Sequence, residues 1–349
     1  MIQIHSKLKD YFIGFHDNLS NDCFCEYDLL IVDTNVFRLH HQVFSEIPEN
    51  LIFKVEVDES KKTLEFSSVV LAKMVESGIN KRSRIAAVGG GVIQDLAGFV
   101  SNIYFRGIRW DYFPTTLLAM GDSCIGGKTS INFNSHKNIL GTFYPPEQII
   151  AAPDFLSTLL IDDYMSGLSE VVKINLVEPS VSPKEIVEQA SSANLNDRSL
   201  PNLLRSTLLI KKTIIEEDEF DTGKRNLLNF GHCVGHALEN ASDFAIPHGL
   251  AVLVGMGVAG YISSELGIAS QNYGKQFANT MDSLFLVKGV NSFLEPEKII
   301  PVMLKDKKRI MDGLTVVCPL PEGGVTLIHD IKPSLVSSAL EHYKRRLVS

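Results

Sequence analysis

The stretch at residues 84–91 constrains the fold of this chain more than any other part of its sequence. It reads Arg-Ile-Ala-Ala-Val-Gly-Gly-Gly, a buried-strand pattern that runs directly into glycines, and an apolar helical segment follows at 92–105. Upstream, residues 29–32 and 51–57 have the composition of strands, and residues 63–76 have the apolar spacing of a helix. Strands that alternate with helices, with glycines where a strand ends, are typical of a parallel sheet. We therefore predict an α/β fold for the first part of the chain.

From about residue 155 onward, helical patterns dominate the sequence. The predicted helices are 159–176, 186–193, 203–219, 227–242, 251–266, 277–286, 297–306 and 333–346. Residues 315–318 and 324–328 interrupt them as short strands and are compatible with a hairpin. A chain of 349 residues is too long for one simple core. We predict an α/β domain at 1–154 and a mainly α-helical domain at 155–349.

Composition excludes several classes of protein. Hydrophobic residues make up 45% of the chain and charged residues 21%, as in ordinary globular proteins. The net charge of −8 argues against non-specific nucleic-acid binding, although a local group of cations can still hold a small anion. No apolar run approaches the length of a membrane span, and the N-terminus has no secretory pattern. Because the five scattered cysteines fit a reducing compartment, we expect a cytoplasmic protein without membrane or nucleic-acid partners.

Three of the ten histidines lie in one short stretch of the second half. His232 and His236 are four positions apart, so on a helix they share one face. His248 stands beside a proline, where a turn leads into the next apolar segment. A helical pair and a loop histidine can hold a metal ion, because metal sites draw ligands from more than one element. The same spacing also fits polar positions on a half-buried helix, and the histidines alone leave both interpretations open.

The glycines at 89–91 are a candidate ligand-binding turn. Glycine lets the backbone approach a ligand closely, and the N–H groups at the start of the next helix favour a pyrophosphate. The sequence Gly-Gly-Gly-Val-Ile-Gln-Asp differs from the dinucleotide fingerprint G-x-G-x-x-G, so a purely structural turn fits as well. Asp95, one turn into the predicted helix, either contacts a ribose hydroxyl or interacts with the helix dipole.

A second glycine-rich segment ends in Gly126-Gly127-Lys128-Thr129. This ending is similar to a phosphate loop, but the earlier glycine of that motif is missing, which disfavours a P-loop nucleotidase. Lys137 and Asn138 follow shortly afterwards, and Lys137 alone fits a surface loop. Lysines and hydroxyls so close to glycines nevertheless suit an anionic group that several donors hold.

Taken together, these motifs resemble those of the 3-dehydroquinate synthases and, more broadly, the sugar-phosphate cyclases. The resemblance extends from about Leu29 to Pro319. The matching segments are 89–99 (GGGVIQDLAGF), 105–107 (FRG), 114–129, 137–138 (KN), 167–173 (GLSEVVK), 229–236 (NFGHCVGH), 248–249 (HG) and 306–308 (DKK). The resemblance implies a Rossmann-like NAD-binding domain followed by a mainly helical domain for metal and substrate.

The resemblance also implies a ligand set for a divalent metal, which is zinc in most of the family, with cobalt as an alternative. The matching positions are Glu170, His232 and His248, and three protein ligands leave room for substrate oxygens. His236 is assigned to the substrate pocket instead. Without the resemblance, Glu170 would simply be the helical i,i+3 partner of Lys173.

For NAD, the resemblance implies contacts in both halves of the dinucleotide. Positions on the adenosine side are Asp33, Asn35, Glu59 and Lys62. Positions near the pyrophosphate and nicotinamide are Gly90, Gly91, Asp95, Thr115 and Thr116.

The implied substrate is a small anionic sugar phosphate, 3-deoxy-D-arabino-heptulosonate 7-phosphate. Lys211 and Arg225 match the family's carboxylate site, where guanidinium geometry is useful. The phosphate-side positions are Lys128, Asn138, Asn229 and either Lys307 or Lys308. Arg106 is expected to reach the neighbouring active site of a homodimer. The set implied to act in catalysis is Asp122, Lys173, Lys211, Arg225 and His236.

The implied activity is that of a carbon–oxygen lyase in the shikimate pathway to aromatic amino acids. It combines transient alcohol oxidation by NAD⁺, β-elimination of phosphate, reduction and an aldol ring closure. Two alternatives stay open: a sister cyclase for sedoheptulose 7-phosphate or glucose 6-phosphate, and a metal-dependent polyol dehydrogenase of the glycerol dehydrogenase type. Leu250, Cys124 and Gln94 depart from the family pattern. Leu250 stands where a glutamate is usual, so the acid that could orient the neighbouring His248 is missing.

Overall fold

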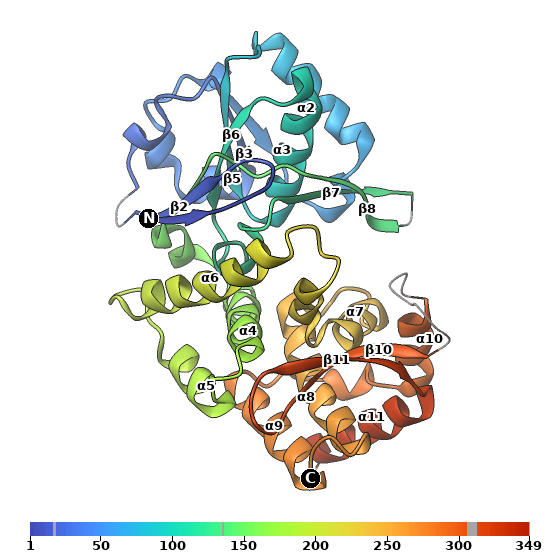
Figure 1. Ribbon diagram of the computed structural model, residues 1–349. Helices are drawn as coiled ribbons and strands as arrows, with labels where there is room; N and C mark the ends of the chain where they lie inside the picture. Colours follow the sequence, from blue (N-terminus) through green and yellow to red (C-terminus); the bar gives the residue numbers. More distant parts are fainter. Residues whose placement is uncertain (17–18, 135, 306–312, 349) are drawn as a thin grey trace. The chain divides into compact units, whose positions relative to one another are not determined.

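A computed structural model describes residues 1–16, 19–134, 136–305 and 313–348. The chain divides into two compact units (Figure 1). The first contains Met1–Leu160 and Lys211–Phe220, and the second contains Ile161–Ile210 and Asp221–Ser349. The predicted boundary at 154/155 therefore lies close to the first crossing between the units, and the return at 211–220 was not predicted.

The first unit contains a seven-stranded sheet in the order β1-β2-β9-β6-β5-β3-β4. Its strands are β1 (Ile2–Ile4), β2 (Tyr11–Phe15), β3 (Leu29–Asp33), β4 (Ile52–Val55), β5 (Arg84–Gly89), β6 (Arg109–Pro114) and β9 (Gln148–Ala151). All neighbours pair in parallel except β1 and β2. The predicted strands at 29–32 and 84–88 are confirmed as β3 and β5, and the one at 51–57 is shorter than predicted. Residues 85–88 are fully buried, as expected for a central parallel strand that is covered on both faces.

The described helices of the first unit include α1 (Thr34–Leu39), α2 (Leu64–Glu76) and α3 (Gly91–Ile103), together with the last part of α6 (Ser199–Glu217) from Lys211 onward. The helices predicted at 63–76 and 92–105 are confirmed as α2 and α3. Thr63 caps α2, since its side chain accepts a hydrogen bond from the backbone N–H of Phe66 at 3.2 Å. Helix α3 packs against β5 and β6 and begins where β5 ends, so its N-terminus lies at the carboxyl edge of the sheet (Figure 1).

A separate two-stranded sheet follows the second glycine cluster. Strand β7 (Lys128–Phe133) pairs antiparallel with β8 (His136–Phe143). The surface-loop interpretation of Lys137 is therefore wrong, because Lys137 and Asn138 lie in β8. Just before this hairpin, residues Ala119–Ser123 form one turn of π-helix, a geometry that is frequent at functional sites.

The second unit is mainly helical, as predicted. It contains α4 (Ile161–Val177), α5 (Pro183–Ser192), α7 (His232–Ala241), α8 (His248–Glu265), α9 (Gln271–Leu284), α10 (Pro296–Leu304), α11 (Pro333–Val348) and the first part of α6 (Ser199–Glu217). Strands β10 (Leu314–Pro319) and β11 (Val325–Ile331) pair antiparallel, which confirms the hairpin. Shorter 3-10 helices lie at 21–24, 41–44, 49–51, 59–61, 104–106 and 153–158 in the first unit, and at 224–229 and 290–292 in the second.

One predicted helix, 227–242, is interrupted in the structure. A 3-10 helix ends at Asn229, and α7 begins only at His232. Gly231 between them has φ +76°, a left-handed conformation that few other residues adopt. A side chain at Gly231 would also press against the carbonyl oxygen of Val252 in α8. This break places His232 at the first position of α7.

Helix α8 is the centre of the second unit. Its residues from Gly249 to Ser264 are all buried, and it packs against α4, α7, α9, α11 and β10. A helix that is apolar all round in this way belongs to a protein core or to a membrane span. In the part of the chain that the structure describes, no helix has both the length and the hydrophobicity needed to cross a bilayer.

Candidate metal and anion sites

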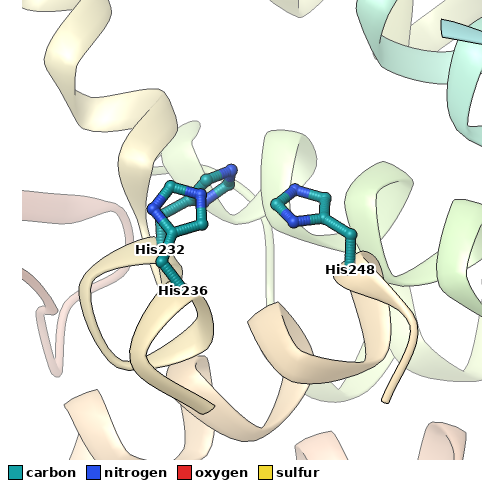
Figure 2. Close-up of side chains that lie close together, drawn as sticks. All are labelled: His232, His236 and His248. Atoms are coloured by element: carbon teal, nitrogen blue, oxygen red, sulfur yellow. The ribbon is translucent and has the colours of Figure 1, made fainter. Parts of the chain in front are cut away.

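Three histidine side chains of the second unit converge on one point. His232 and His236 come from the first turns of α7, and His248 is the first residue of α8. Figure 2 shows their rings turned toward one another, and one ring nitrogen from each lies within 4.8 Å of the other two. Ring centroids are 5.2–5.6 Å apart. The helical pair and the third histidine from another element are therefore brought together, as the sequence suggested.

The position of His248 depends on a close approach between α8 and α4. The backbone N–H of Gly249 donates to Ser166 Oγ at 2.8 Å. A Cβ atom at Gly249 would overlap the carbonyl oxygen of Ser166, so only glycine lets the two helices meet here. Glu170 lies in the same helix, three residues after Gly167, and its side chain faces His248.

Glu170 adds a buried carboxylate to the histidine cluster. Its Oε1 lies 3.6 Å from His248 Nε2, and its Oε2 forms an ion pair with Lys173 on the same helix. Both Glu170 and Lys173 are almost completely buried. The helical i,i+3 pair that the sequence offered as the alternative thus coexists with the contact to His248. Two histidines and one carboxylate are a donor set that suits a catalytic zinc ion.

The protonation of two of these histidines follows from their surroundings. Burial lowers the pKa of His232 well below its usual value, and the charges of Lys173 and the other two histidines lower it further. Burial also lowers the pKa of His248, but the hydrogen bond to Glu239 and the charge of Glu170 outweigh it, so this pKa is raised. His232 Nδ1 lies 3.1 Å from the carbonyl oxygen of Phe230, which accepts a hydrogen bond from the Nδ1–H group. A neutral His232 can therefore offer Nε2 as a ligand.

Further predicted residues of the second unit lie on the segment before α7. Arg225 is 5% exposed and belongs to the 3-10 helix at 224–229, which packs against α4 and β11. Asn229 ends this 3-10 helix, and its Nδ2 lies 3.4 Å from Asn226 Oδ1. Arg225 and Lys173 are thus two buried cations on neighbouring elements. Lys307 and its alternative Lys308 lie outside the described residues.

In the first unit, the predicted NAD residues gather at the carboxyl edge of the sheet. Asp33, at the end of β3, caps α1 by accepting from the Asn35 N–H at 2.7 Å. Gly90 and Gly91 follow β5 directly and begin α3. The chain order reverses between β3 and β5, since β4 lies on one side of β3 and β5 lies on the other. In open α/β sheets, ligands bind outside the carboxyl ends of the strands at such a switch point.

Two threonines after β6 lie at the same edge. The backbone N–H of Thr115 donates to the carbonyl oxygen of Gly89 at 3.1 Å. Thr116 Oγ1 accepts from the Ala119 N–H at 3.2 Å, just before the π-helical turn. Thr115 and Thr116 therefore support the glycine turn and the following helix, in addition to any contact with a ligand.

A polar network connects other predicted NAD residues with a predicted phosphate residue. Lys62 Nζ lies 2.7 Å from Asp95 Oδ2 and 3.7 Å from Glu59 Oε1. Ser130 donates to Asp95 through its N–H at 2.9 Å, and its hydroxyl lies 3.2 Å from Asp95 and 2.9 Å from Asn138 Oδ1. Burial raises the pKa of Asp95, while Lys62 and these hydrogen bonds partly offset it.

The network closes through a residue that the sequence did not single out. Asn132 Oδ1 accepts from the Asn138 N–H at 2.9 Å, and its Nδ2 lies 3.0 Å from Glu59 Oε1. Ser130 and Asn132 are two positions apart in β7, so both side chains lie on the same face of that strand. The alternation in Lys-Thr-Ser-Ile-Asn-Phe was the signal that could have identified them.

The predicted catalytic pair Asp122 and Lys211 is also brought together within the first unit. The ammonium of Lys211 contacts both the carboxylate and the carbonyl oxygen of Asp122, which lies on the π-helical turn. Gln94 supports this turn: its Nε2 donates to Ser123 O, and its Oε1 accepts from Ser123 Oγ, both at 2.7 Å. The departure at Gln94 therefore has a structural role.

Two predicted cations of the first unit lie at the surface. Arg106 is exposed on a short turn in which both Phe105 and Arg106 have positive φ, 49° and 58°. Lys128, at the start of β7, is exposed as well.

Comparison with known proteins identifies the family. Residues 52–166 match the family model described as 3-dehydroquinate synthase N-terminal, and residues 167–309 match 3-dehydroquinate synthase C-terminal. A 3-dehydroquinate synthase of Dictyoglomus thermophilum is 32% identical over 337 residues, or 96% of this chain and 92% of that protein. One of Pyrococcus furiosus is 37% identical over 301 residues, 82% of each chain. This chain belongs to the 3-dehydroquinate synthase family.

The two family segments of this 3-dehydroquinate synthase family member contain the predicted residues except Asp33 and Asn35, which precede residue 52. The glycine turn, Asp95 and Ser130 fall in the N-terminal segment, which ends at residue 166. Glu170 and the three histidines fall in the C-terminal segment, which begins at residue 167 within α4.

Solved structures support the same fold. 2-Deoxy-scyllo-inosose synthase, solved with carbaglucose-6-phosphate, NAD⁺ and Co²⁺, has a TM-score of 0.82 at 22% identity and covers 98% of this chain and 99% of its own. The 2-epi-5-epi-valiolone synthase ValA of Streptomyces hygroscopicus, with NAD⁺ and Zn²⁺ bound, has a TM-score of 0.80 at 22% identity and covers 99% of each chain. A probable glycerol dehydrogenase of Sinorhizobium meliloti follows with a TM-score of 0.57 at 13% identity, over 97% of each chain.

Proposed function

We propose that this protein is a 3-dehydroquinate synthase, which converts 3-deoxy-D-arabino-heptulosonate 7-phosphate to 3-dehydroquinate and phosphate with NAD⁺ and a divalent metal ion. The observation that carries the proposal is the convergence of Glu170, His232 and His248 beside the buried cation Lys173, in a chain that both family segments match. The activity belongs to the synthesis of aromatic amino acids. Five free cysteines agree with our placement of the enzyme in the reducing cytoplasm.

The residues of the second unit fit a metal ion. Imidazole nitrogens and a carboxylate are ligands that zinc and cobalt accept. We assign Glu170, His232 and His248 as ligands, with Lys173 holding the carboxylate from the far side. His236 borders the cluster at the surface, where it can hold or move a proton of the substrate. When bound, the metal supplies a Lewis acid, and NAD⁺ supplies a hydride acceptor that is regenerated.

The residues of the first unit fit a dinucleotide. The N-terminus of α3 follows the glycine turn at the sheet's switch point and favours the pyrophosphate. Lys62 and Glu59 lie on the adenosine side, together with Asp33 and Asn35. Asp95 lies one turn into α3 and is held by Lys62 and Ser130. The positions of these residues therefore support dinucleotide binding, although the G-x-G-x-x-G fingerprint is missing.

We assign the remaining polar residues to a substrate that carries an anion at each end. Lys211 and Arg225, both 5% exposed, are assigned to the carboxylate. Lys128, Asn138 and Asn229 are assigned to the phosphate. Asp122 positions Lys211 through their ion pair.

We assign Arg106 to the neighbouring active site of a homodimer. Its turn is presented at the surface, and Lys81 Nζ holds this turn by donating to the Phe105 carbonyl oxygen at 2.9 Å. A left-handed turn of two non-glycine residues costs free energy, which is consistent with a functional reason for its geometry.

One assay separates this proposal from its two rivals. Purified protein is incubated with NAD⁺, Zn²⁺ or Co²⁺ and one of four compounds: the heptulosonate phosphate, sedoheptulose 7-phosphate, glucose 6-phosphate or glycerol. Phosphate and NADH are measured together. Phosphate release from the heptulosonate phosphate without NADH accumulation supports the synthase.

Other outcomes of the same assay contradict it. Turnover only with sedoheptulose 7-phosphate or glucose 6-phosphate indicates a sister cyclase, which the buried Leu250 beside His248 would favour. NADH accumulation with glycerol indicates a polyol dehydrogenase.

A further inference from the structure

Helix α7 places a third polar side chain on the face that carries two of the histidines. Glu239 follows His232 by seven positions and His236 by three, so all three side chains lie on one side of the helix. Glu239 Oε2 lies 3.1 Å from His248 Nδ1. The Glu239 side chain is 14% exposed and the His248 side chain 34%, so this contact is partly shielded from water.

The ring of His248 is thereby held between two carboxylates. Glu239 contacts Nδ1, and Glu170 Oε1 lies 3.6 Å from Nε2 on the other side of the ring. A neutral imidazole carries one proton, and a carboxylate acceptor at Nδ1 keeps the proton there. The lone pair of Nε2 then faces Glu170 and the cluster.

The arrangement at His248 parallels the one at His232. There, the carbonyl oxygen of Phe230 lies 3.1 Å from Nδ1. In both histidines an oxygen acceptor holds Nδ1 and leaves Nε2 for a ligand. The acceptor of His248 is charged, which raises the basicity of the ring more than a carbonyl does.

Leu250 supplies no carboxylate to His248 from the start of α8. It occupies the first turn of α8, two positions after His248, and is 2% exposed in the core of the second unit. A leucine offers no hydrogen-bond acceptor, so the first turn of α8 cannot orient the ring from that position. Glu239 approaches the same histidine from α7.

We propose that Glu239 is a positioning residue that fixes the tautomer and orientation of His248 for metal binding. The inference rests on the proposed metal site and extends it to a residue outside the ligand set. Groups that hydrogen-bond to a metal-binding histidine typically change metal affinity about 10- to 100-fold when they are removed.

The test compares metal affinity in wild-type protein, Glu239→Ala and Glu239→Gln. Metal is stripped with a chelator, and Co²⁺ and Zn²⁺ are titrated back against a competing chelator while the visible Co²⁺ spectrum is recorded. We expect Glu239→Ala to bind about 10- to 100-fold more weakly. Glu239→Gln keeps a hydrogen-bond acceptor but loses the charge. Its metal affinity should therefore lie between those of the wild type and Glu239→Ala.

The chain offers a matched control in another glutamate–histidine pair of the same unit. Glu265 Oε1 lies 2.9 Å from His342 Nδ1, away from the cluster. Glu265→Gln should leave the Co²⁺ affinity and spectrum unchanged. Thermal unfolding of each metal-free variant shows whether a loss of affinity reflects misfolding. If Glu239→Ala does not fold, the metal affinity of Glu239→Gln tests the proposal.

Wild-type affinity and spectrum in Glu239→Ala would overturn the proposal, as would an equal loss in Glu265→Gln. A wild-type protein that binds no divalent metal would overturn both this inference and the proposed metal site. A wild-type protein that binds metal but releases no phosphate would refute the proposed function alone, because the affinities of the Glu239 variants are measured without substrate.

Discussion

The ammonium group of Lys62 donates to the carboxylate of Asp95, with Nζ and Oδ2 2.7 Å apart, across 33 positions of sequence. Lys62 is 5% exposed, and it also lies 3.7 Å from Glu59. The pair joins the segment before α2 to the second turn of α3. It therefore connects the residues proposed for the adenosine side of NAD with those proposed for the nicotinamide side.

Replacing Lys62 with methionine should destabilise the first unit and weaken NAD⁺ binding. The substitution leaves the largely shielded Asp95, whose side chain is 20% exposed, without its countercharge, and breaking such a pair costs about 3 kcal/mol. Urea unfolding followed by the fluorescence of Trp110 measures the effect, since the chain has one tryptophan and it is buried in β6 of this unit.

The neighbouring Lys61 supplies the control for this prediction. Its ion pair with Glu56 lies at the surface, where such pairs contribute about 0–1 kcal/mol. Lys61→Met should therefore unfold close to wild type. Equal unfolding midpoints for the two variants would show that the Lys62–Asp95 pair is not what stabilises the unit.

Ser130→Ala should weaken NAD⁺ and phosphate binding with little loss of stability. The hydroxyl of Ser130 lies between Asp95 and Asn138, and its loss removes contacts worth about 1 kcal/mol, or roughly a fivefold change in affinity. The backbone hydrogen bond from Ser130 to Asp95 remains. Calorimetric titration with NAD⁺ and with inorganic phosphate measures both constants.

Ser68→Ala is the matched control, because Ser68 Oγ donates only to the carbonyl oxygen of Leu64 within α2. It should bind both ligands like wild type. Unchanged affinities in Ser130→Ala would show that the hydroxyl does not link the two sites.

The sequence allowed much of the fold to be predicted because its main signals are local. Apolar periodicity and glycine positions identified β3, β5, α2, α3 and most helices of the second unit. It did not reveal β6 and β9, whose short segments contain Trp110, Asp111 and Gln148 among apolar residues. Nor did it reveal that 211–220 returns to the first unit, because the partners of that segment are distant in sequence.

The candidate site shows the same limit. The spacing of His232 and His236 predicted a shared helix face, which the structure confirms. It could not show that Glu170 approaches His248, since that contact depends on how α4 and α8 meet at Gly249. Glu239 was missed although it lies on the same helix face, because a glutamate on a half-buried helix is ordinary until its partner is known.

Acidification should destabilise the first unit through His40. This ring is 8% exposed, and its Nε2 lies 2.9 Å from Thr158 Oγ1. Burial lowers the pKa of His40, and Asp154 offsets only part of that effect. The unfolded chain, with a pKa near 6.5, therefore binds a proton at a higher pH than the folded chain does.

The contribution of the neutral His40 to the free energy of unfolding is thus fully present above pH 6.5. It decreases as the pH falls from 6.5 to the pKa of the folded state. His40→Gln removes the titrating group and keeps a polar side chain near Thr158. Urea midpoints read from Trp110 between pH 7.5 and pH 5.5 should decline less steeply in this variant. Parallel slopes for variant and wild type would contradict the assignment.

The two possible ligand sets of the second unit predict different results for His236. Ring nitrogens of all three histidines lie within 4.8 Å of one another, so geometry alone permits a three-histidine site. In the proposed set of Glu170, His232 and His248, replacing any member with alanine should remove most of the metal. His236→Ala should keep the metal and lose activity, because His236 is proposed to contact the substrate and is exposed at the edge of the cluster.

Metal content after dialysis, measured by elemental analysis, decides between the two sets. Chelator treatment of the wild type should abolish phosphate release, and Zn²⁺ or Co²⁺ should restore it. The carboxylate provides the sharpest comparison: Glu170→Gln keeps the shape of the side chain but removes the charge that pairs with Lys173 and faces His248 Nε2. Full metal content in Glu170→Gln together with an empty His236→Ala protein would establish the three-histidine site, because the carboxylate would then be dispensable and the third imidazole essential.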